Sequence, residues 1–302
     1  MQGLTLALGF LVAAQTQAPA SGRLPDFAPL ARLDAPGLRT DALKTVADAE
    51  PARYVVAAAA RSTVVYELPA GARTVREIAV EPARGTAEAW RNARLRLTWE
   101  SDEPADAGVD LPLGLMFGRA TAKVGIGPSL FVSGEGPAWS TRLPMPYRTQ
   151  ARLQIDTDRP LAGRIVVKTT RGVDPDAGYL RAASWGAGGT LKDSGRGRIV
   201  GAMVVKETAA AGRSSHVGLL TVDGRSPEPF CETVGLLSAA IADPDRVSVA
   251  VTGREPASAA FLWRGADPIR YEHSFSVGPG DAAPAVVFWY SERPGPGGAP
   301  PR

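Results

Sequence analysis

Few residues of this 302-residue chain have the type and spacing that catalysis requires. Cys231 is the single cysteine, and a thiol becomes a good nucleophile only where a base or a positive charge activates it. The chain has two histidines, His216 and His273, and no known local signature surrounds the cysteine. We therefore predict a buried structural thiol, with a catalytic nucleophile as the less favoured alternative.

The acid next to a histidine does not form a catalytic pair either. Glu272 directly precedes His273, and successive side chains of a strand point to opposite faces of the sheet. No spacing of His, Cys and carboxylate residues is typical of a metal site. We expect the protein to bind no metal and no other cofactor.

Four tryptophans offer ring faces that suit the C–H face of a sugar. Trp139, Trp263 and Trp289 lie in strand-like segments, where packing in the core is the favoured interpretation. Trp185 lies in the loop-like stretch ASWGAGG and is the candidate residue for substrate binding.

Strand patterns dominate the elements that must position these residues. STVVYEL (62–68), TVREIAV (74–80) and ARLRLTWE (93–100) alternate apolar and polar residues or are rich in β-branched ones. Similar segments continue to about residue 170, and a second series runs from about 198 to 291, with 33 glycines and 26 prolines spread between them. The pattern predicts an all-β fold of two tandem jelly-roll β-sandwiches.

These segments also predict how the chain is divided. The apolar run 4–14 is too short to span a bilayer and is typical of a secretory signal, although no Lys or Arg precedes it. We expect a secreted or periplasmic protein without a membrane span. The predicted boundaries are a signal peptide at 1–20, an N-terminal arm or linker at 21–60, a first jelly roll at 61–184, a Gly-rich joint at 185–197, a second jelly roll at 198–293 and a disordered tail at 294–302.

The charge of the chain argues against one class of partner. Its 34 basic and 31 acidic residues are scattered along the whole sequence, for a formal net charge of +3. No basic stripe interleaved with aromatic residues appears, so nucleic-acid binding is not predicted.

Six segments of the chain carry a recognisable pattern in a fixed order: VDLPLGLMFG (109–118), LPMPYRTQARLQI (143–155), GRGRIVGAMVV (195–205), LLTVDG (219–224), FLWRGADPIRYEHSFSV (261–277) and AVVFWYSERPG (285–295). In this order they resemble a family of secreted bacterial double jelly-roll proteins, the domain of unknown function 2961, now glycoside hydrolase family 172. Members of that family include difructose-anhydride-forming enzymes and D-arabinofuranosidases.

The resemblance implies hydrolysis by two glutamates, but the matching positions here have changed. Counting back from the VDG segment, the first glutamate of the family falls on Ser215. Glu232 is the acid nearest to the second, and only if a gap is allowed; ungapped counting reaches Leu236. A polar loop of the family's sugar site is replaced by the alanine-rich stretch EPARYVVAAAARSTVVYEL. Asp110 and Glu272 match family positions, and we interpret both as structural.

Two hypotheses follow from this pattern. We favour a catalytically degenerate relative that acts as a carbohydrate-binding or assembly module, with a glycan or oligosaccharide as ligand. The alternative is an active glycoside hydrolase on α-D-arabinofuranose or fructofuranose substrates that uses Glu232 and a second, unidentified acid. Either form is expected to be a homo-oligomer, of which a trimer is one possibility. A capsid-like structural subunit is a third class, by analogy of fold alone.

Overall fold

The computed structural model describes residues 24–35, 44–46, 48–101, 103–119, 131–133, 137–185, 189–206, 216–232, 258–263, 268–278 and 285–295. Strands make up most of these residues, and the helices are short, which confirms the predicted all-β fold. The predicted signal peptide and nearly all of the predicted tail lie outside the described residues. None of the helices among the described residues is long and apolar enough to cross a membrane.

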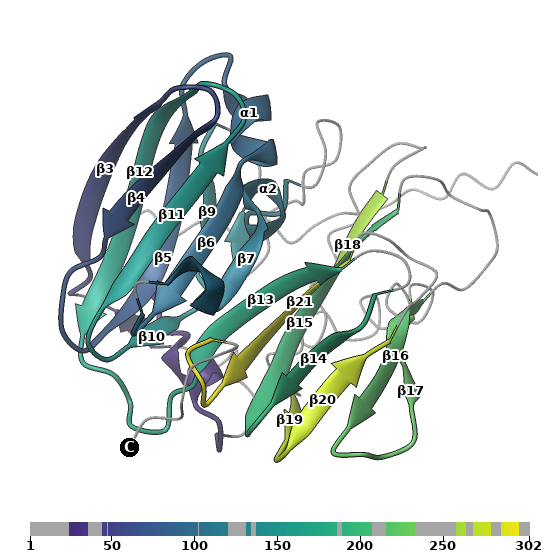
Figure 1. Ribbon diagram of the computed structural model, residues 1–302. Coiled ribbons are helices and arrows are strands. Elements are labelled where there is room, and N and C mark those ends of the chain that lie inside the picture. Colours follow the sequence, from purple (N-terminus) through teal and green to yellow (C-terminus); the bar gives the residue numbers. More distant parts are fainter. Residues whose placement is uncertain are drawn as a thin grey trace, which may run out of the picture.

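The first half of the chain forms a sandwich of two facing four-stranded sheets, extended by short edge strands (Figure 1). One sheet has the order β3-β12-β5-β9, and the facing sheet has the order β4-β11-β6-β7. Successive strands switch between the two sheets, except for β6 and β7, which are neighbours in one sheet, and this is the strand order of a jelly roll. The strands are β3 (Glu50–Ala58), β4 (Ser62–Glu67), β5 (Arg73–Pro82), β6 (Arg94–Trp99), β7 (Val109–Pro112), β9 (Trp139–Thr141), β11 (Ala151–Thr157) and β12 (Leu161–Arg171).

The second half repeats this topology. Its sheets have the orders β13-β21-β15-β18 and β14-β20-β16-β17, which is the same alternation of strands. Two tandem jelly rolls are therefore confirmed by the strand pairing itself. The strands are β13 (Tyr179–Trp185), β14 (Leu191–Ser194), β15 (Gly197–Lys206), β16 (His216–Val222), β17 (Glu228–Glu232), β18 (Ser258–Trp263), β20 (Ser274–Val277) and β21 (Ala285–Ser291).

Several short elements complete these two units. The strands β8 and β10 extend the sheet of β5 and β9, while β19 pairs with β15, and β1 pairs with β2 in the N-terminal arm. Their bounds are β1 (Leu24–Pro25), β2 (Thr45–Val46), β8 (Val132–Ser133), β10 (Met145–Tyr147) and β19 (Ile269–Tyr271), with helices α1 (Ala87–Asn92) and α2 (Leu113–Met116) and 3-10 turns at Ala28–Ala31 and Pro104–Asp106.

Among the described strands, one parallel pairing joins the two jelly rolls. Ala182 and Ala183 of β13 lie opposite Val109 and Asp110 of β7, so one sheet of each unit merges into a continuous nine-stranded sheet. Figure 1 shows the two sandwiches side by side along this sheet. Side chains from β6 and β7 of the first unit thereby come next to the second unit.

Alternation along the strands decides which side chains enter the cores. In β6 the side chains of Leu95 and Leu97 are buried, while Arg94 is exposed and Arg96 is half-buried. The same period of two runs through β11, where every second residue is buried. Such strands place apolar residues in the core and polar ones on the opposite face of the sheet.

Two segments that the sequence predicts as an arm and a joint contain strands of the sandwiches. β3, in the predicted arm 21–60, pairs with β12 over nine residue pairs, and β14, in the predicted joint 185–197, pairs with β20. The Pro and Ala residues of EPARYVVAA weaken its strand signal, since both residue types are depleted in strands. The sequence boundaries of the two units stay a prediction.

Part of the N-terminal arm packs firmly against the body of the protein. Leu30 is completely buried, and arginines of the second unit bind the carbonyl groups that follow. Arg198 donates to the carbonyls of Arg32 and Ala35, and Arg270 donates to that of Ala35 at 2.5 Å. Burial lowers the pKa of Arg198 to about 10. The arm therefore contacts the second jelly roll through main-chain acceptors.

The Pro-Met-Pro segment forms a short strand at the contact between the two units. Met145 is fully buried and pairs with Val75 of β5. The hydroxyl of Tyr290, in the second unit, donates to the carbonyl of Pro144 at 2.8 Å. Just after this segment, the carboxylate of Glu100 accepts backbone N–H bonds from Thr149 at 2.8 Å and from Arg148. Hydrogen bonds from both units therefore hold the chain around Pro-Met-Pro in place.

An Asp-Gly turn closes β16. Asp223 and Gly224 have φ of +48° and +72°, and the N–H of Arg225 donates to the carbonyl of Val222 at 2.9 Å. Positive φ at both central residues is the type I′ geometry, which Asp-Gly pairs adopt readily. The Asp223 carboxylate also accepts the N–H groups of Glu272 at 3.0 Å, His273 at 2.8 Å and Ser274 at 3.0 Å.

This carboxylate predicts a pH-dependent stability. Partial burial raises the pKa of Asp223, but the three backbone N–H groups and His273 lower it more, so its net pKa is below the usual value. The charged Asp223 carboxylate therefore contributes fully to the free energy of unfolding above its unfolded pKa of about 4. This contribution is lost as the pH falls through the folded pKa. At pH 7, Asp223→Asn should lower the free energy of unfolding by about 1 kcal/mol. Urea denaturation of both proteins between pH 7 and pH 2.5 should show this difference shrinking; a constant difference would contradict the assignment.

Candidate functional site

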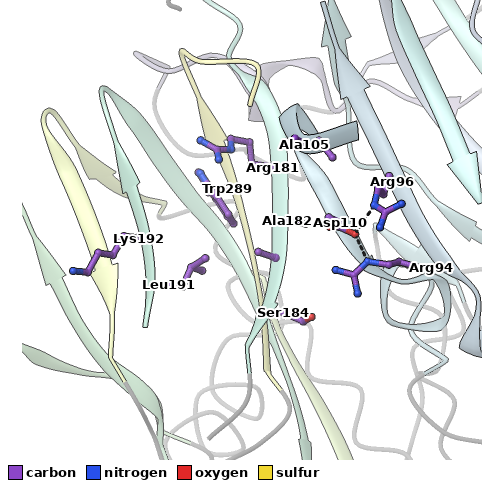
Figure 2. A pocket seen from close by; sticks show the side chains of 13 residues that line it. Arg94, Arg96, Ala105, Asp110, Arg181, Ala182, Ser184, Leu191, Lys192 and Trp289 are labelled. Carbon is purple, nitrogen blue, oxygen red and sulfur yellow. Dashed lines mark hydrogen bonds and ion pairs between the residues drawn. The ribbon is translucent and has the colours of Figure 1, made fainter. Parts of the chain in front are cut away.

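A cavity of about 570 Å³ opens where the two jelly rolls meet (Figure 2). This volume lies within the range of pockets that take small ligands. The first unit contributes strands β6 and β7 and the turn before β7, and the second unit contributes β13, β14 and β21. The lining residues are Arg94, Arg96, Ala105, Ala107, Gly108, Asp110, Arg181, Ala182, Ala183, Ser184, Leu191, Lys192 and Trp289.

Asp110 contributes a carboxylate to this cavity from the first unit. It forms an ion pair with Arg94 at 2.5 Å and another with Arg96 at 3.4 Å. This pairing raises the pKa of Arg94. Arg96 also pairs with Asp156 of β11. β6 and β7 are antiparallel neighbours, and Arg96 lies directly opposite Asp110, so the register of the sheet sets this contact.

The wall from the second unit contains a buried polar network. The guanidinium of Arg181 pairs with Asp193 and lies over the ring of Trp289, with 5.2 Å between the guanidinium carbon and the ring centroid. Asp193 also accepts from the Tyr271 hydroxyl at 2.6 Å and from the Trp289 indole N–H at 2.9 Å. Burial, followed by the charge of Asp193, raises the pKa of Tyr271 far above its usual value. Three donors on one buried carboxylate fix the positions of Arg181 and Trp289.

The carboxylates near this cavity do not form a catalytic pair. Hydrolysis of a glycosidic bond requires an acid and a second carboxylate on either side of the bond. Asp110 is the single carboxylate among the lining residues, and two arginines neutralise it. The side chain of Asp193 is 4% exposed and is bound by three donors of the protein. The described residues around this cavity therefore present polar groups but not two free acids.

The predicted catalytic residue lies far from this cavity in the sheet order. Glu232 ends β17, which is at the opposite edge of its sheet from the cavity strand β14, and its backbone pairs with that of His216. The side chains of Glu232, His216 and Cys231 lie outside what the structure describes. Among the described residues, no group of three or more His, Cys, Asp and Glu side chains could hold a metal ion.

Two of the four candidate tryptophans have described side chains, and both of these are buried. Trp139 and Trp289 are 3% and 1% exposed, so both pack in the interior, as their strand positions predict. Trp185 ends β13, directly after the cavity residue Ser184, and its backbone pairs with Ala285. Its side chain lies outside the described part, so its predicted role in ligand binding stays a prediction.

The cationic residues of the cavity were not predicted from the sequence. Arg94 and Arg96 alternate with buried leucines in RLRL, which indicates an outward-facing pair but not a neighbouring unit across from it. Arg181 is a charged residue within the largely apolar segment YLRAAS, and this is the signal that could have identified it. No sequence pattern identifies Lys192 as a cavity residue, because its position beside the cavity depends on how the two units pack.

Comparison with solved structures finds capsid proteins of low sequence identity. The major capsid protein P2 from bacteriophage PM2 is 11% identical, with 80% of this chain and 97% of that chain covered and a TM-score of 0.49. The STIV MCP is 12% identical, with 80% and 96% covered and a TM-score of 0.37. TM-scores below 0.5 do not establish a shared fold, and the jelly-roll assignment above depends on strand pairing alone.

Comparison of sequences locates one family similarity. None of the curated proteins compared with the chain matches it significantly. The family model described as GH172 domain-like matches residues 49–161, a range that begins next to β3 and ends at the start of β12. Residues 49–161 are therefore similar to a GH172 domain, and they make up most of the first jelly roll.

Proposed function

We propose that the protein is a non-catalytic relative of the GH172 domain that binds a carbohydrate in the cavity between its two jelly rolls. The observation that carries this proposal is the composition of the cavity wall: one neutralised carboxylate beside several hydrogen-bond donors and apolar surface from alanine and leucine. Sugar sites combine polar groups that orient the ligand with apolar surface that covers its C–H groups. Export of the protein is part of the proposal and comes from the apolar run 4–14.

Both the sequence and the composition of the cavity support a loss of catalysis. The sequence has Ser215 where the resemblance implies a glutamate, and the described cavity contains a single carboxylate. An enzyme that uses Glu232 and a second, unidentified acid stays the alternative. The two proposals differ in a measurable way, because a two-carboxylate enzyme loses most of its turnover when either acid is replaced by its amide.

An activity screen separates these proposals. We expect no turnover of aryl α-arabinofuranosides or fructofuranosides by the purified wild-type chain, and the same background rate in Glu232→Gln. Release of the aryl group should be followed at pH 5 and pH 7, so that an acid with a shifted pKa is not missed. Turnover by the wild type that disappears in Glu232→Gln would establish the enzyme instead.

A further inference from the structure

We infer that the cavity binds an uncharged sugar, and that the main-chain N–H and C=O groups of Lys192, at the open edge of β14, are the groups that recognise it. The inference deepens the proposed carbohydrate binding and depends on it. It starts from the hydrogen-bond register of β14 and from the balance of charges around the cavity.

Lys192 lines the cavity with its main chain. Its neighbours Leu191 and Asp193 point into the second unit, where Leu191 packs against the core and Asp193 pairs with the buried Arg181. Successive side chains of a strand point to opposite faces, so that of Lys192 points outward and is exposed. Figure 2 shows its ammonium group directed away from the other lining residues. Its contribution to the cavity wall is therefore the backbone.

The pairing of β14 with β20 leaves these backbone groups free. The N–H of Gly195 donates to the carbonyl of His273 at 2.8 Å, which sets the hydrogen-bonded positions of this antiparallel pair. Such positions recur at every second residue, so Asp193 and Leu191 also bond to β20. Lys192 lies between them, and its N–H and C=O point away from β20. β14 is the edge strand of its sheet, so no other described strand pairs with these groups.

The open edge of β14 faces the cavity. β14 lies over β13, because the side chains of Asp193 and Arg181 form an ion pair between the two strands. The sheet that contains β13 continues to β7 and β6, whereas the facing sheet ends at β14. Figure 2 shows Arg94 and Asp110 on the far side of the cavity from Leu191. A ligand in this space can therefore contact the β14 backbone on one side and Arg94 on the other.

The charges around the cavity compensate one another. Each of the three arginines that line it has a carboxylate partner, and the ion pairs are Arg94–Asp110, Arg96–Asp110, Arg96–Asp156 and Arg181–Asp193. An ionised ligand would lose its hydration without gaining an uncompensated counterion. Hydroxyl groups need only donors and acceptors, which the Lys192 backbone and the half-exposed side chain of Arg94 supply. These contacts favour an uncharged sugar.

The two backbone groups of Lys192 suit a pair of neighbouring hydroxyls. The N–H and C=O of one extended residue point to the same side, and a hydroxyl can accept from the first while another donates to the second. A peptide that adds as a strand needs such groups along several residues. Ser194, the next open position of β14, does not line the cavity. The site therefore fits a sugar better than an extended peptide.

The first test separates the backbone of Lys192 from its side chain. In titration calorimetry, we expect the full chain to bind arabinotriose, kestose or galactotriose more tightly than trigalacturonate, with little change up to about 0.5 M NaCl. Lys192→Pro removes the N–H and should weaken this binding about tenfold. Lys192→Ala keeps the backbone and should retain most of the affinity. Ser194→Pro, at the next open position of the same edge, is the matched control and should bind as the wild type does.

Amide hydrogen exchange tests the same contact without a substitution. The N–H groups of Lys192 and Ser194 both point away from β20, so both should exchange quickly in the free protein. Saturation with the sugar that binds best should slow exchange at Lys192 by about tenfold and leave Ser194 unchanged. This measurement also decides the matter if Lys192→Pro does not fold.

The outcomes distinguish this inference from the proposed function. Full binding by a folded Lys192→Pro, equal losses in Lys192→Ala and Lys192→Pro, or unchanged exchange at Lys192 would overturn recognition by the backbone while leaving carbohydrate binding in place. Tighter binding of trigalacturonate than of the neutral sugars would overturn the uncharged ligand in the same way. Binding of none of the four oligosaccharides would overturn the inference and count against the proposed function as well.

Discussion

Replacement of Asp193 by alanine is expected to lower the free energy of unfolding by about 3–5 kcal/mol. The side chains of Arg181 and Asp193 are 7% and 4% exposed, so the variant leaves the arginine charge buried without its counterion. The Tyr271 hydroxyl and the Trp289 indole N–H also lose their acceptor. A buried charge without a partner costs more than the pair contributes when both members are present.

A double variant separates this explanation from a general defect in packing. Asp193→Leu combined with Arg181→Met removes both charges, and should recover part of the stability lost in Asp193→Ala, as measured by urea denaturation. Glu88→Gln is the exposed control, because Glu88 and Arg159 are each 59% exposed and their ion pair should contribute less than 1 kcal/mol. A double variant less stable than Asp193→Ala would contradict the buried-charge account.

The second large effect is expected at Gly197, the first residue of β15. A Cβ atom at this position would lie 2.1 Å from the Tyr271 hydroxyl oxygen and 2.4 Å from the Tyr290 carbonyl oxygen. Both partners are held in place, since Tyr271 donates to Asp193 and the backbone of Tyr290 lies between Arg198 of β15 and Leu180 of β13 in the sheet. Gly197→Ala should therefore destabilise the protein by about 3 kcal/mol, at the upper end of overpacking effects.

Gly278→Ala is the matched control for this substitution. A Cβ at Gly278 has the Leu219 carbonyl oxygen as its nearest neighbour, at an ordinary contact distance of 3.7 Å. We expect a change below 1 kcal/mol for Gly278→Ala in thermal and urea unfolding. Similar stabilities for the two alanine variants would show that Tyr271 can move, and that the network around Asp193 is less rigid than its contacts indicate.

The sequence predicts the architecture better than the site. Alternation in segments such as ARLQIDT and RLRLTW identifies strands and their buried faces, because a strand with one face in the core has a period of two. The pairing of β7 with β13 has no such signal, because it depends on the packing of two units. The cavity is formed by that pairing, and this is why Lys192 and Arg181 were not predicted.

The predicted acids show a second limit of sequence reasoning. Asp110 was interpreted as structural, and its two ion pairs agree with that role, but it also lines the cavity. The sequence points to Glu232 because it lies near a family position along the chain, whereas the order of strands puts β17 and β14 at opposite edges of one sheet. Distance along the sequence does not report distance across a sheet that has Greek-key connections.

The central claim, binding in the cavity without cleavage, is tested most directly by following one oligosaccharide for both events. Calorimetric titration should be combined with a count of new reducing ends for the wild type, for Ser184→Trp, which fills the cavity, and for Val55→Trp, which adds the same side chain at a site 75% exposed on β3. We predict saturable binding by the wild type and Val55→Trp, no binding by Ser184→Trp, and no new reducing ends. Unchanged binding by Ser184→Trp, or reducing ends that accumulate with the wild type, would contradict the account.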